Sequence, residues 1–341
     1  MVAQRVAAFL DGATKTLDVA IYDLRLEDSP GNTLLNSFES AVKRGVVTRL
    51  MFNQDHAMAI PVPPPPQIDW AFVDRLRSTG VQVMPIPGIP DLMHHKYVVR
   101  DAASVLTGST NWTNDSWTRE ENVIIKIPST PLAAEYAKNF AELWETGRVE
   151  GSGKYDLAGV PVVYQDTPVK THVVFAPGRG RQMAHMIADR IAHARRRIRV
   201  CSPVITAGVI LGTLGDLAHK SHPDFKGVFD RTQMAEVLGQ WRVDPHATWK
   251  GPAFQAVSSA LAFASKVTTP YTPTSVHDFM HAKITVVDNT VFTGSYNLSH
   301  AGEDNAENLL ALDSAPLADR FVEFIDAVFA RYAATPAAAR Q

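Results

Sequence analysis

Hydrophobic residues follow two alternating periods along the first part of the chain. Residues 2–13 place apolar side chains on one helical face, and residues 17–21 then alternate apolar and polar side chains as a half-buried strand does. The same alternation continues through a helix that ends near Gly45, a strand over 46–52, a helix over 70–80 and a strand over 81–86. Strands separated by helices predict an α/β fold.

This pattern recurs in the second half of the chain. The segment from Phe9, FLDGATKTLDVAIYD, resembles the segment from Ile191, IAHARRRIRVCSPVI, and amphipathic helices are expected over 132–143 and 317–328. The Gly-rich segment 147–161 lies between the two copies. We therefore expect two duplicated domains, one over residues 1–150 and the other over residues 165–335.

Composition narrows the class of protein. The chain of 341 residues is 45% hydrophobic and 20% charged, which is typical of a globular protein, and no apolar run is long enough for a transmembrane segment. A net charge of −2 argues against a protein built mainly to coat nucleic acid, although it leaves room for a local basic groove. The start, MVAQRVAAFLDG, shows no signal peptide, so the compartment stays open between cytoplasmic and secreted, as does the completeness of the N-terminus.

One motif occurs twice in the chain and contains the candidate catalytic residues. Each copy has His-x-Lys, an aspartate five residues after the lysine, and then Gly-Ser-x-Asn. The first copy comprises His94, Lys96, Asp101, Gly108, Ser109 and Asn111, and the second comprises His281, Lys283, Asp288, Gly294, Ser295 and Asn297. Because alternate strand residues share a face, each histidine and its lysine can point into one cleft. A duplicated strand and turn alone would not explain a buried histidine beside a buried lysine.

The doubled HxKxxxxD followed by GSxN resembles the signature of the phospholipase D superfamily, over nearly the whole chain. This resemblance implies an α/β/α sandwich in each half, with the halves packed about a pseudo-twofold axis so that both motifs line one active site. It implies a monomer with both half-sites in one chain. It also implies cleavage or transfer of a phosphodiester through a covalent phosphohistidine, without a metal or another cofactor.

Residue chemistry fits that reaction independently. A histidine serves as nucleophile or as proton donor near neutral pH, and fixed positive charge stabilises the phosphate oxygens. By analogy with the family we expect His94 as nucleophile and His281 as general acid and then base, although the near symmetry of the sequence leaves the reverse assignment open. Lys96 and Lys283 would hold the phosphate. Asn111 and Asn297 would help them, with Ser109 and Ser295 as further substrate contacts.

Each histidine needs a carboxylate on its other ring nitrogen to fix its tautomer. The segments EEN and AEN match between the copies, so we nominate Glu121 and Glu307, with Glu120 as a rival for the first. Asp101 and Asp288 stand at the strand ends, where we expect them to bond turn amides rather than act in the chemistry.

Other histidines and aromatic residues are weaker candidates. His95 points to the opposite strand face from His94, which favours a core position, whereas His277 could line the mouth of the cleft. No third ligand accompanies His277 and His281 at metal-binding spacing, and neighbouring lysines would repel a cation, so no metal site is expected. Trp112 and Trp117 could flank the cleft or pack in the core.

The fold and the motif do not identify the substrate. We expect a phospholipid at a membrane surface to be the substrate of a phospholipase D-type phosphodiesterase. A nuclease of the same superfamily, with nucleic acid as its substrate, is the alternative, and a cardiolipin synthase-like phosphatidyltransferase is a further one. A catalytically inactive binding protein would lack one of the histidine-lysine pairs, and both are complete. The headgroup and the choice between hydrolysis and transfer stay open.

Overall fold

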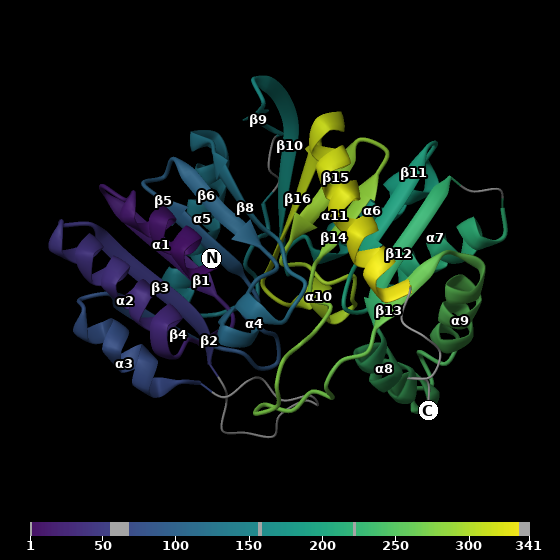
Figure 1. Ribbon diagram of the computed structural model, residues 1–341, viewed down its shortest axis with the longest axis horizontal. Coiled ribbons are helices and arrows are strands. Elements are labelled where there is room, and N and C mark those ends of the chain that lie inside the picture. The colour runs from purple at the N-terminus through teal and green to yellow at the C-terminus, as the bar shows by residue number, and fades with distance from the viewer. Residues whose placement is uncertain (1, 55–67, 156–158, 221–222, 334–341) are drawn as a thin grey trace.

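Two mixed β-sheets stand side by side in the computed structural model (Figure 1). The structure describes residues 2–54, 68–155, 159–220 and 223–333. The proline-rich segment 60–67, whose composition predicts a stiff surface loop, lies outside the described residues. In sheet order, the first sheet consists of β4 (Gln82–Pro87), β3 (Val47–Gln54), β1 (Thr16–Ile21), β5 (Lys96–Arg100), β6 (Ser104–Gly108) and β8 (Ile124–Pro128).

The second sheet repeats this order and extends it by two strands. In sheet order it consists of β13 (Phe263–Lys266), β12 (Asp224–Asp230), β11 (Arg197–Cys201), β14 (Ile284–Val287), β15 (Thr290–Gly294), β16 (Glu307–Asp313), β10 (Thr167–Ala176) and β9 (Val160–Tyr164). Its first six strands correspond one by one to the six strands of the first sheet, which confirms the duplication. The second sheet begins at Val160 and so takes in residues before 165.

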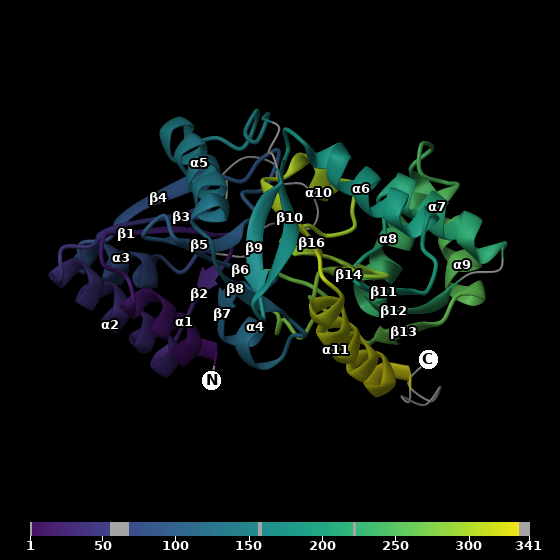
Figure 2. The same cartoon turned by 90° about the horizontal axis from the view of Figure 1, so that it is seen from above.

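Helices cover both faces of each sheet (Figure 2). The first half contains α1 (Val2–Asp11), α2 (Asp28–Lys43), α3 (Trp70–Ser78), α4 (Asn114–Thr118) and α5 (Thr130–Thr146). The second half contains α6 (Gly180–Ala192), α7 (Gly208–Ala218), α8 (Arg231–Val243), α9 (Lys250–Ala260), α10 (Ala301–Asp304) and α11 (Ala315–Ala333). A short parallel pair, β2 (Leu24–Arg25) and β7 (Trp112–Thr113), lies beside the first sheet. The expected α/β/α sandwich is confirmed in both halves.

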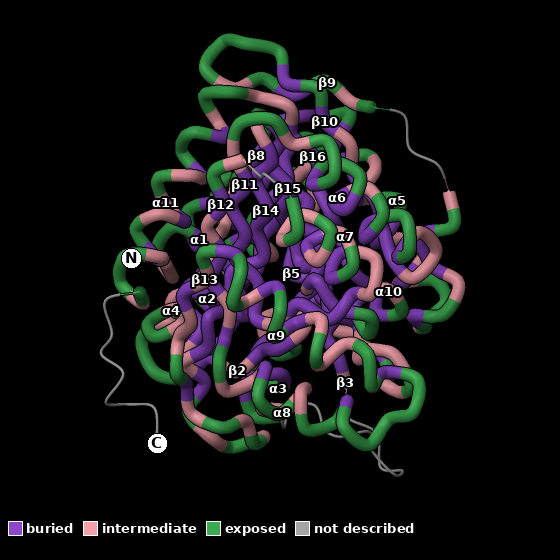
Figure 3. The backbone as a smooth tube through the Cα atoms, turned by 90° about the vertical axis from the view of Figure 1, so that its right-hand side faces the viewer, coloured by how far each residue is buried: buried purple, intermediate pink, exposed green. Residues whose placement is uncertain are grey.

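The layers follow the hydrophobic pattern of the strands. On the first sheet, Val19 and Leu50 pack with α1, α2 and α3, whereas Val99 and Val105 point to the opposite face and pack with α5. On the second sheet, α6 to α9 cover one face and α11 covers the other. Residues from α5 and α11 belong to one buried cluster with members in both halves. Figure 3 shows the buried residues gathered in the interior of the molecule. The halves therefore share a core rather than merely touching.

Local signals set the helix ends. The side chain of Ser129 caps α5 by accepting a hydrogen bond from the amide of Leu132, and Gly147 ends the helix in a left-handed conformation with φ 62°. The helices expected over 2–13, 70–80, 132–143 and 317–328 are confirmed by α1, α3, α5 and α11. Among the described residues, no helix is both long and apolar enough to cross a membrane.

Candidate active site

Both motifs meet where the two halves join. The amide of His94 donates to the carbonyl of Ala306, 3.0 Å away, and the amide of His281 donates to the carbonyl of Glu121, 3.1 Å away. Each motif histidine lies just before its strand, β5 or β14. The hydrogen bonds show that the main chain of each histidine is held by the opposite half. The charges of His281 and Lys283 act on His94, and those of Lys96 act on His281, so the four side chains form one electrostatic unit.

The histidine of the first motif, His94, is oriented by a carboxylate from the second half of the chain. His94 Nδ1 lies 2.5 Å from Glu307 Oε1, and Glu307 is fully buried. A contact this short contains a proton, and the neighbouring lysines favour the form in which Nδ1–H donates to an ionised carboxylate. Burial raises the pKa of Glu307, but Lys96 and Lys283 act against this shift and favour its anion. Burial and the positive charge of Lys96 lower the pKa of His94 well below its usual value. This arrangement leaves Nε2 of His94 as a free lone pair.

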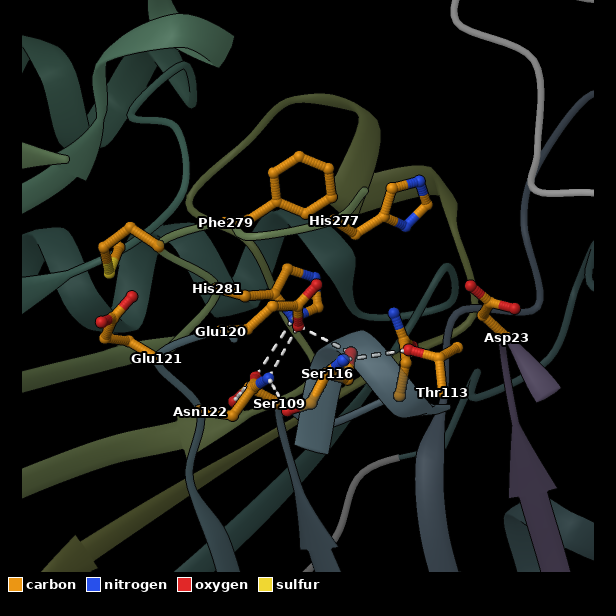
Figure 4. A network of polar contacts seen from close by, with 12 residues as sticks. Asp23, Ser109, Thr113, Ser116, Glu120, Glu121, Asn122, His277, Phe279 and His281 are labelled. Atoms are coloured by element: carbon orange, nitrogen blue, oxygen red, sulfur yellow. Dashed lines mark hydrogen bonds and ion pairs between the residues drawn. The ribbon is translucent and has the colours of Figure 1, made fainter. Parts of the chain in front are cut away.

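In the second half, the histidine has a different pair of partners (Figure 4). His281 Nδ1 lies 3.1 Å from Asn122 Oδ1 and 3.2 Å from Glu120 Oε2. The side chain of Glu120 is only 2% exposed, and it accepts hydrogen bonds of 2.7 Å from Ser116 Oγ and from Asn122 Nδ2. Desolvation raises the pKa of Glu120 to about 7.

The nomination of Glu121 as the carboxylate that orients a histidine is wrong. Its Oε2 pairs with Lys266 Nζ at 2.6 Å, and its Oε1 accepts from Arg331 at 3.2 Å and from the hydroxyl of Tyr332. Successive residues of an extended segment point to opposite sides, so Glu120 and Glu121 cannot face the same histidine. Figure 4 shows Glu121 apart from the network that surrounds His281.

The two motif lysines are placed equivalently. Lys96 Nζ donates to the carbonyl of its own His94 at 2.6 Å, and Lys283 Nζ donates to that of His281 at 2.8 Å. Both ammonium groups are buried, and burial lowers the pKa of Lys96 well below its usual value and that of Lys283 to about 7. An anion bound between them would favour the charged form of both, so the pair is suited to hold a phosphate.

The amides and hydroxyls after each motif divide into two groups. Within the part of the chain that the structure describes, Oδ1 of Asn111 and of Asn297 is buried without a hydrogen-bond partner. By contrast, Ser109 Oγ donates to Asn122 Oδ1 at 2.7 Å and accepts from the amide of Val123. The Ser295 hydroxyl likewise accepts from the amide of Asn308 at 3.0 Å. We therefore correct the expected role of both serines from substrate contact to support of the turn.

Glycine is required in each turn. Gly108 has φ 153° and Gly294 has φ 146°, and a Cβ would lie 2.0 Å from the carbonyl oxygen of Val123 or 2.3 Å from that of Asn308. No side chain fits at such distances. The two glycines thus bring strands β6 and β15 close to the segments that carry the orienting residues.

The motif aspartates bond backbone amides, as expected for a structural role. Asp101 accepts from Thr14, Lys15 and Thr16, at distances from 2.6 to 3.1 Å. Asp288 accepts from the equivalent turn at 195–197. These bonds lower the pKa of both carboxyls despite the opposing effect of burial.

Neighbouring residues fall outside the reacting centre. His95 is fully buried and packs its ring against Tyr97, which agrees with a core position. Trp112 is buried as well, whereas the half-buried Trp117 donates its Nε1 to the carbonyl of Asn111 at 2.8 Å. His277 Nδ1 lies 3.3 Å from a guanidinium nitrogen of Arg25, a neighbour that opposes cation binding. No group of three His, Cys, Asp or Glu side chains suited to a metal occurs among the described residues.

Sequence reasoning missed one aromatic residue of the site. The ring of Tyr22 lies 4.6 Å from that of His94 and meets it edge-on, and Lys96 Nζ lies 4.8 Å from the tyrosine ring. Tyr22 directly follows β1, the strand that pairs with β5. Its place at the end of a strand next to the motif strand was the available signal.

Comparison with known proteins identifies the class and then the family. The duplicated sandwiches and the paired motifs are those of the phospholipase D superfamily, a class of phosphodiesterases and phosphatidyltransferases. The chain belongs to the family described as "Cardiolipin synthase, PLD-like domain", whose model matches residues 6–144 and 187–329. The two matched ranges correspond to the two halves of the fold.

Individual relatives are more distant. Proteins named mitochondrial cardiolipin hydrolase are 31% identical over 141 residues in Xenopus laevis and 25% identical over 141 residues in Chlamydomonas reinhardtii, in each case 41% of this chain. The aligned part of the chain spans 60% and 56% of the length of these curated relatives. Among solved structures, phosphatidylserine synthase of Haemophilus influenzae superposes with a TM-score of 0.69 at 12% identity, covering 97% of this chain and 84% of that one. This likeness shows the fold alone.

Proposed function

We propose that the chain is a phospholipase D-type phosphodiesterase that hydrolyses or transphosphatidylates a phospholipid through a covalent phosphohistidine, without a metal. The observation that carries this proposal is the meeting of both His-Lys pairs at the junction of the halves, with each imidazole Nδ1 held from the opposite half. Such an arrangement leaves the Nε2 atom of each ring available for the reaction. Each lysine donates one hydrogen bond to its own histidine carbonyl and keeps further N–H donors with which to neutralise the phosphate.

In the first step, His94 Nε2 attacks the phosphorus and forms an N–P bond while the P–O bond to the leaving alcohol breaks. Attack places positive charge on the ring of His94, which the ionised Glu307 offsets at 2.5 Å. His281 donates the Nε2 proton to the departing alkoxide. Lys96 and Lys283 stabilise the charge that accumulates on the non-bridging oxygens.

In the second step, His281 accepts a proton from water, and the resulting hydroxide attacks the phosphorus. The N–P bond breaks, which releases a phosphomonoester and restores both histidines. A lipid alcohol in place of water gives a new phosphodiester, so hydrolysis and transfer share every residue of this scheme and differ only in the acceptor.

The substrate class rests on the relatives. Their printed names are those of cardiolipin hydrolases, and the family is described by cardiolipin synthase. We propose cardiolipin, whose two phosphates are diesters, as the first phospholipid to test. The net charge of −2 argues against a protein built mainly to coat nucleic acid.

The test compares lipid and nucleic acid as substrates in the same buffer. Purified protein is incubated with cardiolipin liposomes, phosphatidylcholine liposomes or supercoiled plasmid, each with and without EDTA, and products are measured by mass spectrometry or gel. We expect phosphatidic acid to appear from the liposomes at equal rates with and without EDTA. Plasmid nicking with intact lipid would contradict the lipid substrate, and loss of turnover in EDTA would contradict the metal-free reaction.

A further inference from the structure

Strand pairing gives the true correspondence between the two halves after the motif. In the first sheet Gly108 pairs with Ile124, and in the second Gly294 pairs with Leu309. The two glycines are equivalent members of the repeated motif. Ile124 therefore corresponds to Leu309, an offset of 185 residues.

Bridges between the halves give the same offset. Met93 bridges to Ala306, and Met280 bridges to Glu121. Both methionines directly precede a motif segment, Met93 before His94 and Met280 before His281. Ala306 thus corresponds to Glu121, and the letters EEN and AEN, which match by eye, are one residue out of register.

This slip places a neutral residue where the other half has a carboxylate. At an offset of 185, the residue equivalent to Glu307 is Asn122. Glu307 contacts His94 Nδ1, and Asn122 contacts His281 Nδ1 in the same way. An amide oxygen can accept the Nδ1 proton and fix the tautomer, but it carries no charge to stabilise a protonated ring.

The missing charge is supplied from two residues earlier. Glu120 reaches His281 Nδ1 at 3.2 Å, and Asn122 Nδ2 donates to the same carboxylate oxygen at 2.7 Å. At the position equivalent to Glu120, the second half has Asn305, whose Oδ1 accepts from the amide of Leu92. The carboxylate at 120 thus has no counterpart in the second half, and Figure 4 shows it directed at His281.

We propose that Glu120 is the positioning residue of His281 and supplies the negative charge that Asn122 cannot. This inference rests on the proposed function, in which His281 alternately gives and takes a proton. Asn122 Oδ1 accepts from the Nδ1–H of His281 and sets the tautomer. Glu120 stabilises the imidazolium each time Nε2 is protonated, and Asn122 Nδ2 fixes the carboxylate in place.

The surroundings of Glu120 make this part of the site sensitive to pH. Lys283, Lys96, Asp23 and His281 are the ionisable groups that act on it, and Lys283 favours its anion while Asp23 opposes it. Desolvation raises the pKa of Glu120 to about 7, so acidification removes its charge within the working range of a histidine enzyme.

Glu120 and Asn122 line a hollow of about 640 Å³ between α1 and α11, together with Phe9, Trp117 and Phe324. Two charged residues, Arg5 and Lys126, line the same hollow.

The kinetic test exchanges the positions of the carboxylate and the amide. Glu120→Gln should lower kcat on cardiolipin liposomes about 10–100-fold, with KM changed less than about 3-fold, because a stabilised protonation state is lost rather than a substrate contact. The double variant Glu120→Gln/Asn122→Glu places the carboxylate where the framework places Glu307, and it should recover most of the lost kcat. Glu323→Gln, which removes an exposed carboxylate paired with Arg320, is the charge-matched control.

The spectroscopic test needs no substrate. In protein labelled with ¹⁵N-histidine, the Nδ1 resonance of His281, assigned by its absence from His281→Asn, should shift with a step near pH 7 as Glu120 titrates. The same step should be absent from Glu120→Gln, which separates it from the titration of Lys283 in the same pH range. The titration tests the Glu120–His281 contact separately from the proposed function. If the protein cleaved no phospholipid, the proposed function would fail, but the titration step would still be expected. A His281 resonance without that step, a normal kcat in Glu120→Gln, or no recovery in a stably folded double variant would each overturn the proposal.

Discussion

The two halves of this chain share a strand order and a motif, yet they hold their histidines differently. His94 faces a fully buried carboxylate at 2.5 Å, whereas His281 faces an amide and a carboxylate that has no counterpart in the other half. The two imidazoles therefore occupy equivalent positions in the two halves, but the residues that contact their Nδ1 atoms differ. We propose His94 as the nucleophile because a phosphorylated ring carries a lasting positive charge, and the carboxylate closest to either ring is that of Glu307 beside His94.

Removal of either histidine should give the largest effect. We expect His94→Asn and His281→Asn each to lower kcat/KM on phospholipid about 10³-fold or more, since each ring carries a separate bond-making or proton-transfer step. A diester with 4-nitrophenol as leaving group distinguishes the roles of the two histidines, because nitrophenolate departs without needing a proton from His281. His281→Asn should then release one burst equivalent of nitrophenol, and His94→Asn should release none; equal bursts would erase the distinction.

Loss of the carboxylate behind His94 should come next. Glu307→Gln removes the charge that stabilises the ring after attack, and its amide can donate to Nδ1 and impose the wrong tautomer. We expect kcat to fall about 10²–10⁴-fold by analogy with a triad aspartate changed to its amide. The loss should exceed that in Glu120→Gln when both are assayed by phosphatidic acid release, and the reverse ranking would contradict the assignment.

The alkaline side of the pH profile should report Lys283. Burial lowers its pKa to about 7, so the free enzyme loses this positive charge as pH rises through that value, and kcat/KM should fall there. The His94 ring has a pKa well below its usual value and stays unprotonated and nucleophilic on the acid side of that limb. Lys283→Arg keeps its charge at all accessible pH, so the residual kcat/KM of this variant should lack the decrease that Lys283 causes near pH 7. Loss of the proton that His281 donates still lowers kcat/KM as pH rises.

The smallest effect on turnover should come from the motif aspartates. Asp288→Asn removes an anion that accepts three backbone amides, and we expect a loss of about 1–2 kcal/mol in the free energy of unfolding at pH 7. The pKa of Asp288 is lowered by folding, so its stabilisation is present above the unfolded value of 3.8 and is lost as pH falls through the folded pKa. Urea unfolding at pH 7 and pH 3 should show the difference between wild type and variant shrink on acidification.

The sequence predicted most of the fold because its signals are local. The apolar faces of α1, α5 and α11 and the cap of α5 at Ser129 depend on neighbours in the chain. Strands β9 and β10 were not predicted to join the second sheet. Strand β10 pairs with β16, which follows it by well over a hundred residues, and β9 joins the sheet only through its pairing with β10. The duplication could be recognised from the sequence because the residues of the motif recur in the same order in the second half.

The orienting residues of the site were harder to predict. The match of EEN with AEN suggested Glu121, whereas one additional residue between Asn111 and β8 shifts the register so that Glu120 and Asn122 face His281. Only the pairing of strands reveals that slip. Ser109 and Ser295 likewise carried the right letters at the right spacing, and their hydroxyls are engaged in the turns.

The most direct test of this account is to locate the covalent phosphate. Wild-type protein is mixed with the nitrophenyl diester, quenched at alkaline pH where phosphohistidine persists, digested and mapped by tandem mass spectrometry. We predict the phosphoryl adduct on His94, with none on His281. An adduct on His281, or on neither histidine during turnover, would contradict the division of roles between the two halves.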